Sequence, residues 1–194
     1  MVSRDGAARA VAQRSVDLLI AIGPSVPVVD TRDAVIDVLR GYGEPDPITI
    51  SDSDMTGLRE AATALWPVFT ATTTGQAAER LNFILGTYGH PPRLSRHDGS
   101  VWHLHIDSSD DGAWAPWFAS SSAMAIATLL TDRQANPAGQ CSSPSCERPF
   151  IDLGQGDTRR YCSPRCASRE RAAAHRLRHN TTADRRDGAS DHRS

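Results

Sequence analysis

All four cysteines of this 194-residue chain lie in its last third, in two close pairs separated by a 15-residue segment. A structural zinc ion takes four ligands in a tetrahedron, and two close pairs supply them with little loss of chain entropy. The sequence therefore predicts one structural zinc ion bound by Cys141, Cys146, Cys162 and Cys166. Two disulfides or a redox-active thiol pair are the alternatives, and a catalytic zinc is disfavoured because it would keep one position open.

The residues around the cysteines predict how the chain folds about the metal. Glycines at 154 and 156 favour a hairpin that leads from residues 149–153 to residues 158–161. Ser163 is a suitable N-cap for a helix over 164–179, which begins with a proline and carries Cys166 in its first turn. A knuckle, a hairpin and such a helix together form a treble-clef-like zinc finger.

The upstream chain predicts a mainly helical domain with a small β-hairpin, which makes the fold class α+β. Residues 16–22 also fit a buried strand, so the first helix has an alternative. The expected helices cover 7–22, 33–40, 51–69, 74–88 and 110–129, and the expected strands cover 48–50, 93–96 and 101–106, the last two joined by a turn at 97–100.

Composition shifts along the chain predict four segments. Residues 1–131 form the α+β domain, 132–140 a linker, 141–180 the zinc finger and 181–194 a disordered tail. No apolar run approaches the roughly 20 residues of a membrane span, and the start does not read as a signal peptide. We therefore expect a soluble cytoplasmic protein that does not engage membranes.

Charge is divided unevenly between the two ends. Residues 1–138 carry 10 arginines and 16 acidic residues, net −6, whereas residues 139–194 carry 11 arginines and 7 acidic residues, net +4. Such a basic segment on a small finger is typical of polyanion binding. Within residues 158–180, Glu170 is the one acidic residue among seven candidate nucleic-acid-binding arginines: Arg159, Arg160, Arg165, Arg169, Arg171, Arg176 and Arg178.

The spacing on the predicted finger helix suggests which face does what. Cys166, Ala173 and Leu177 recur at helical spacing and are expected to pack on the zinc and the hairpin. Arg165, Arg169 and Arg176 are expected to form a stripe on the opposite side. The alternative is that some of these arginines neutralise the four thiolates, whose zinc complex carries a net charge of −2.

A second candidate site is the pair His103 and His105. The two histidines fall on one face of the predicted strand 101–106, and the apolar Trp102, Leu104 and Ile106 are expected to face the core. Histidines at this spacing can bind a metal or line an effector pocket, or they are simply the polar face of an edge strand. The chain has no phosphate-binding loop, nucleophile elbow or metalloprotease helix, so we do not expect an enzyme.

Several motifs resemble two known domains. The segments Cys141-Ser-Ser-Pro-Ser-Cys146, Phe150-Ile151-Asp152, Arg159-Arg160-Tyr161-Cys162-Ser163 and Cys166-Ala167-Ser168-Arg169 are similar to the CGNR zinc finger. The segments Pro92-Arg93-Leu94-Ser95, Trp102-His103-Leu104-His105 and 114–129 resemble the ABATE domain, which precedes this finger in bacterial proteins described as stress-induced transcription regulators. The Gly-Asn pair of the finger's name is Ala167-Ser168 here, and Ile20 stands where many relatives have Asn.

The resemblance implies a zinc-binding, DNA-binding transcription regulator that acts in a stress response. Its N-terminal domain would sense a small-molecule effector or form a homodimer. The alternative is a zinc-finger adaptor that recognises protein and does not bind nucleic acid directly.

Overall fold

The computed structural model describes residues 4–27, 29–96, 102–109, 112–154 and 159–188. The fold is α+β and mostly helical, as predicted, with two small two-stranded sheets. In chain order the elements are α1 (Arg4–Ile22), α2 (Arg32–Gly41), α3 (Asp52–Phe69), α4 (Thr74–Tyr88), β1 (Arg93–Ser95), β2 (His103–His105), α5 (Trp114–Arg133), β3 (Ala138–Gln140), β4 (Pro149–Ile151) and α6 (Pro164–Gly188).

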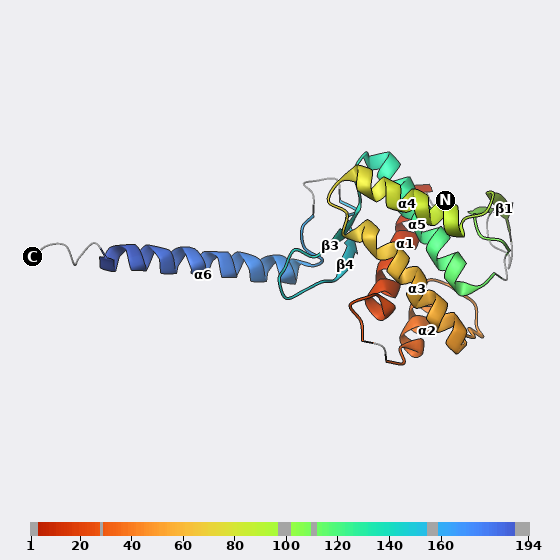
Figure 1. Ribbon diagram of the computed structural model, residues 1–194, viewed down its shortest axis with the longest axis horizontal. Helices are drawn as coiled ribbons and strands as arrows, with labels where there is room; N and C mark the ends of the chain where they lie inside the picture. The colour runs from red at the N-terminus through yellow and green to blue at the C-terminus, as the bar shows by residue number, and fades with distance from the viewer. Residues whose placement is uncertain (1–3, 28, 97–101, 110–111, 155–158, 189–194) are drawn as a thin grey trace, which may run out of the picture.

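The body of the molecule is a bundle built around α5. This helix packs against α1, α3 and α4, while α2 packs against α1 (Figure 1). The side chains of Phe118, Ala123 and Ile126 on α5 are fully buried because helices cover it on several sides. The same packing shows that residues 16–22 are helical, which excludes the alternative of a buried strand.

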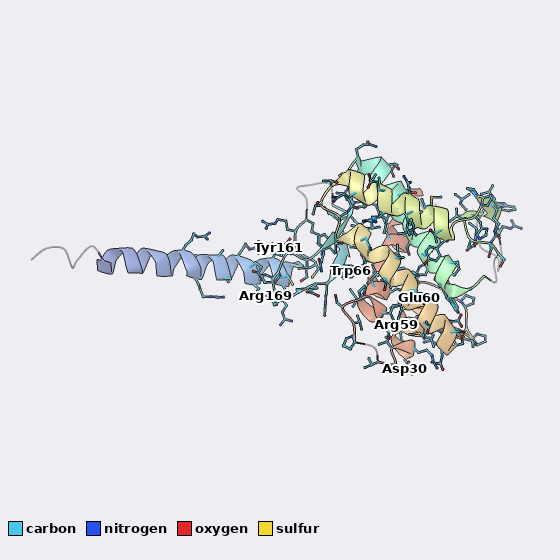
Figure 2. All side chains as sticks on the ribbon, in the orientation of Figure 1. Asp30, Arg59, Glu60, Trp66, Tyr161 and Arg169 are labelled. Carbon is cyan, nitrogen blue, oxygen red and sulfur yellow. The ribbon has the colours of Figure 1, made fainter. Side chains whose placement is uncertain are left out.

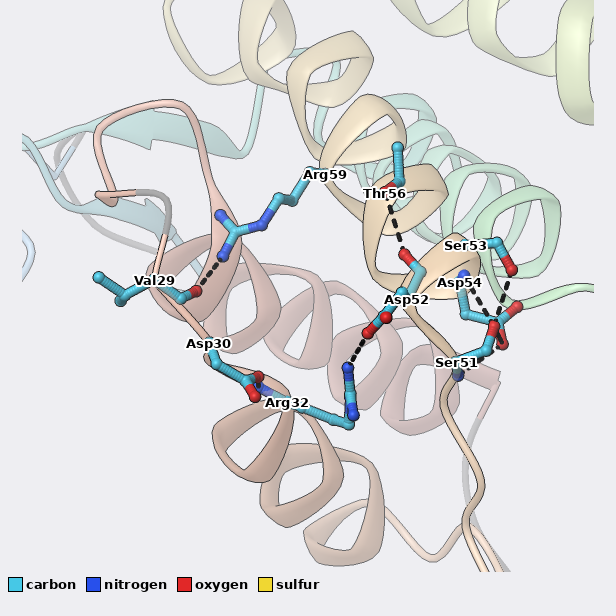
Figure 3. Close-up of polar contacts among 9 residues, drawn as sticks. All are labelled: Val29, Asp30, Arg32, Ser51, Asp52, Ser53, Asp54, Thr56 and Arg59. Carbon is cyan, nitrogen blue, oxygen red and sulfur yellow. Dashed lines mark hydrogen bonds and ion pairs between the residues drawn. The ribbon is translucent and has the colours of Figure 1, made fainter.

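A network of polar contacts fixes where α3 begins (Figure 3). The Ser51 hydroxyl accepts a hydrogen bond from the Asp54 amide at 3.1 Å, and the Asp54 carboxylate accepts one from the Ser51 amide at 2.9 Å. This reciprocal capping box satisfies helix N–H groups that have no partner within the helix, and its hydrogen bonds lower the pKa of Asp54. Arg32 at the start of α2 contacts Asp52, so the two helix starts are joined.

Two predicted elements differ in the structure. Residues 48–50 are not a strand, because no neighbouring strand pairs with them among the described residues; instead the Thr49 carbonyl accepts a hydrogen bond from the Trp114 indole at 3.1 Å. The last helix of the body begins at Trp114 and ends at Arg133, later at both ends than predicted. Pro116 in its first turn needs no amide partner, which suits this start. Asp110 and Asp111, the predicted caps, lie outside the described residues.

The β1–β2 hairpin turns its apolar side to solvent. Leu94 pairs with Leu104 across the two antiparallel strands, and these side chains are 70% and 56% exposed. Trp102 is 65% exposed, and only Ile106 of the predicted apolar set is buried. The prediction that Trp102 and Leu104 face the core is therefore wrong. The small hairpin packs on the body through residues that follow β2, so strand alternation did not indicate the buried side. The predicted turn at 97–100 lies outside the described residues.

Helix α6 leaves the body and extends away from it as a single helix (Figure 1). It continues to Gly188, whereas the predicted helix ends at residue 179 and the predicted disordered tail begins at residue 181. Residues 181–187 contain neither proline nor glycine, so nothing in them stops a helix that is already formed. Residues 189–194 lie outside the described part of the chain.

Candidate metal centre

The first cysteine pair lies at the tip of a hairpin that the sequence analysis did not predict. β3 pairs with β4 in an antiparallel register that joins Ala138 to Ile151 and Gly139 to Phe150. The predicted hairpin from 149–153 to 158–161 is therefore wrong, because β4 takes its partner from the preceding segment. Gly139 permits this pairing: a Cβ there would lie 2.7 Å from the Phe150 ring.

The hairpin leads directly into the cysteine knuckle. The Cys141 amide donates to the Arg148 carbonyl at 3.0 Å, and the Cys146 amide donates to the Ser143 carbonyl at 2.9 Å. The Ser142 amide donates to the Arg160 carbonyl at 2.8 Å, which attaches the segment before Cys162 to the knuckle. Backbone hydrogen bonds thus bring the two cysteine pairs together.

The four sulfur atoms have the spacing of a tetrahedral zinc site. All four Sγ atoms lie within 4.8 Å of one another, with Cys146 and Cys162 at 3.6 Å and Cys162 and Cys166 at 3.8 Å. Zinc–sulfur bonds of about 2.3 Å in a tetrahedron give a sulfur–sulfur separation of about 3.8 Å. The cysteines therefore hold one structural zinc ion, as predicted, and they are unpaired as disulfides.

Ser163 organises the last two ligands. Its hydroxyl accepts a hydrogen bond from the Cys166 amide at 3.2 Å, as an N-cap of α6 does. A separate hydrogen bond between the Ser163 side chain and the Cys166 sulfur lowers the pKa of the Cys166 thiol to about 7, whereas burial raises the pKa of the Cys162 thiol to about 12. Because zinc binds thiolates and must displace these protons, its affinity falls as the pH falls.

Two of the seven candidate arginines, Arg159 and Arg169, hydrogen-bond to the backbone or side chains around the cysteines. Arg159 donates to the carbonyls of Tyr161 at 2.7 Å, Ile151 at 3.5 Å and Cys162, and its guanidinium lies over the Phe150 ring at 5.1 Å. Arg169 donates to the Ser143 hydroxyl at 2.7 Å and to Cys166 Sγ at 3.5 Å. Tyr161 and Arg169 lie where α6 leaves the body (Figure 2).

Arg169 was predicted to lie on the side of the helix opposite Cys166. It lies beside Cys166 instead, with Nη2 3.5 Å from Cys166 Sγ. Three residues along an α-helix amount to a rotation of about 60° from the starting residue, so Arg169 is a neighbour of Cys166 on the helix surface. Ala173 is half-buried, and the Leu177 side chain lies outside the described residues, so its part in the predicted apolar seam stays a prediction. All seven candidate arginines are exposed residues, Arg159 and Arg169 included; the other five are Arg160, Arg165, Arg171, Arg176 and Arg178.

The finger shares its core with the helical body. Ala138 and Ile151 belong to the same buried cluster as the side chains of α1, α3 and α5. The Asn136 amide donates to the Val68 carbonyl at 3.0 Å, and Arg9 donates to the Leu153 carbonyl at 3.2 Å. Residues 132–140, predicted as a linker, thus contain the end of α5 and a paired strand.

Asp152 is a supporting residue of the site, which the sequence motif contains but to which no role was assigned. Its carboxylate accepts hydrogen bonds from the amides of Gly154 and Arg159, both at 3.1 Å, and forms an ion pair of 3.5 Å with Arg133. It therefore joins α5, β4 and the segment that carries Cys162. Its place next to the buried Phe150-Ile151 strand is the sequence signal that could have revealed it.

Replacing Asp152 with Ala is expected to lower the free energy of unfolding by about 1–3 kcal/mol, because two amides and a half-buried guanidinium lose their partner. Urea denaturation followed by circular dichroism measures this loss. The matched control is Asp132→Ala, which removes an exposed carboxylate from the end of α5, next to Arg133, and should cost less than about 0.5 kcal/mol. Equal midpoints for the two variants would contradict the assigned role.

The histidine pair is only partly described. His105 is mostly buried, with Nδ1 3.0 Å from Asp107 Oδ1, and Arg93 forms an ion pair of 2.9 Å with the same carboxylate oxygen. The side chain of His103 lies outside the described residues, so its part in a second site stays a prediction. Among the residues described, only the four cysteines form a group of three or more that could hold a metal ion.

Comparison with known families finds a match for each of the two predicted domains. Residues 138–179 match the CGNR zinc finger, and residues 7–133 match the ABATE family, whose description is Putative stress-induced transcription regulator. No match was found among curated proteins. No helix of the described chain is long and apolar enough to cross a membrane. Because the ABATE match covers well over half of its residues, this chain belongs to the ABATE family and carries a CGNR zinc finger at its C-terminal end.

Proposed function

We propose that this protein is a DNA-binding transcription regulator in which α6 binds the phosphate backbone. The observation that carries the proposal is the position of this helix, which extends from the cysteine cluster and clear of the body (Figure 1). Five of its arginines are exposed: Arg165, Arg169, Arg171, Arg176 and Arg178. A helix that does not pack on a core is only marginally stable in water. We therefore infer that α6 is stabilised by binding a partner.

The charge and length of α6 suit a duplex. The helix carries seven arginines and three acidic residues, so its net charge is +4. Its 25 residues span about 37 Å at 1.5 Å per residue, about one turn of B-DNA. Lysine and arginine bind phosphates by displacing condensed counterions, which makes affinity fall with salt. These features support contact with phosphates and assign no particular base sequence.

We assign effector sensing or dimerisation to the N-terminal domain, with no catalytic step. The exposed Leu94 and Leu104 pair on the β1–β2 hairpin supports a role in binding another protein surface, and a second copy of the chain is the occupant we propose. Sedimentation of the wild type and of Leu104→Arg tests this role, because a charge at the centre of the face should leave a monomer.

Fluorescence anisotropy with a random-sequence duplex tests the DNA proposal. Arg176→Ala is expected to weaken binding, whereas Arg80→Ala, the same change at an exposed helical position of the body, should not. If zinc-loaded wild-type protein does not bind the duplex at about 50 mM salt, the DNA proposal fails. The protein-interaction adaptor is then the better account of the basic helix.

A further inference from the structure

We propose that Arg169, Ser143 and Glu170 form a clamp that ties the zinc knuckle to α6. In this clamp Arg169 is a positioning residue that donates to a zinc-bound thiolate and is not a phosphate contact. The role in DNA binding rests on the function proposed above, whereas the role at the zinc site does not.

The geometry places Ser143 at the centre of the clamp. Ser143 lies between the first two cysteines and is 3% exposed, so its hydroxyl needs partners within the protein. It accepts a hydrogen bond from Arg169 Nη2 at 2.7 Å and donates one to Glu170 Oε1 at 2.5 Å. Its carbonyl accepts the Cys146 amide, so knuckle and helix meet at one residue.

Arg169 connects the clamp to the metal ligands. The same Nη2 atom that binds Ser143 lies 3.5 Å from Cys166 Sγ, and Nε lies 3.5 Å from Glu170 Oε1. A guanidinium at this position offsets part of the negative charge of four thiolates and strengthens their hold on zinc. These contacts use Nε and Nη2, so Nη1 is the part of this 44% exposed side chain that they leave to solvent.

The clamp also gives a role to Glu170, which stands among the arginines of residues 158–180. Glu170 is the one acidic side chain in residues 158–180, and it would weaken phosphate binding if it served no other purpose. Its side chain is only 22% exposed, and it accepts from both Ser143 and Arg169. It therefore holds the knuckle against the helix.

The clamp fixes the direction of α6, because the helix has few other contacts with the body. Without the clamp, the knuckle would be joined to the helix start through the zinc and through two hydrogen bonds that precede the helix, from the Ser142 amide to the Arg160 carbonyl and from the Cys162 amide to Cys141 Sγ. The helix would then sample more orientations, and DNA affinity would fall although no phosphate contact is lost.

The test compares Arg169→Ala with Arg171→Ala in the full chain. Arg171 is the matched control, since it lies two residues further along and, among the described residues, its hydrogen bond is to the Ser168 hydroxyl, at 3.0 Å, and not to a cysteine or the knuckle. Transfer of zinc to a chromogenic chelator is expected to be at least tenfold faster in Arg169→Ala and unchanged in Arg171→Ala, in line with other groups that support metal ligands. Ser143→Ala, a small change that keeps all charges, should also speed zinc transfer.

The salt dependence of duplex binding supplies the second measurement. Arg169→Ala should weaken binding and leave the salt slope as in the wild type, while Arg171→Ala should lower the slope by about one unit. Unchanged zinc transfer in both Arg169→Ala and Ser143→Ala would overturn the clamp. If the wild type does not bind DNA at all, the zinc measurement alone still decides the matter.

Discussion

Replacing Cys162 and Cys166 with Ser is expected to abolish zinc binding and to unfold the knuckle and the first turns of α6. This is the largest effect we predict, because the binding free energy of a structural zinc is about 10–16 kcal/mol in small zinc fingers and is available only to the folded site. Elemental analysis of the purified protein measures the zinc, and hydrogen exchange locates the unfolded amides. The double variant Ser142→Ala, Ser145→Ala is the control, since it changes two exposed knuckle residues that are not ligands.

The β3–β4 hairpin should survive this loss. Ala138 and Ile151 are buried in the core of the body, so the strands that carry them have a partner other than the metal. Hydrogen exchange should therefore remain slow in β3, β4 and α5 of the zinc-free variant while it becomes fast around Cys141 and Cys146. Retention of zinc in the double cysteine variant would contradict the ligand assignment. Fast exchange in α5 would contradict the shared core.

The second large effect is expected from α6. Replacing its exposed arginines with Ala should weaken binding to a random duplex at about 50 mM salt on the order of 100-fold, because several phosphate contacts are lost together. Alanine is the best helix former, so the helix itself should persist. The four positions are Arg165, Arg171, Arg176 and Arg178.

This fourfold variant keeps Arg169 of the clamp and Arg159, which donates to the carbonyls near Cys162. The zinc content should therefore equal that of the wild type, and elemental analysis measures it. Circular dichroism verifies the helix content. A loss of zinc in this variant would show that the replaced arginines support the thiolates instead of binding phosphates.

The sequence predicted the metal site better than the strands around it. Cysteine spacing is a strong signal because zinc requires four donors, and the family resemblance supports the same four residues. The partner of β4 was missed because Ala138-Gly139-Gln140 has no strand signal of its own. These residues nevertheless pair with β4, and Gly139 makes the pairing possible because it leaves room for the Phe150 ring.

Two further features, the exposed face of the β1–β2 hairpin and the buried Ser143, had no signal in the sequence. The exposed side of the β1–β2 hairpin could not be predicted from alternation, because a two-stranded sheet has two faces and the sequence does not say which one meets the body. The clamp was missed for another reason: Ser143 is one of several serines in the knuckle, and only the fold shows that it is the buried one. Arg169 was predicted to be a phosphate contact from its charge and its place on the helix, and this stays a prediction; only the fold shows that its guanidinium lies 3.5 Å from Cys166 Sγ.

The salt dependence of duplex binding tests the central claim most directly. The logarithm of the binding constant is measured against the logarithm of salt concentration for the wild type and for the variant that lacks Arg165, Arg171, Arg176 and Arg178. Four phosphate contacts predict slopes that differ by about 3.6 units, at about 0.9 per contact. Equal slopes, with zinc and helix content intact in both proteins, would contradict a phosphate-binding role for α6.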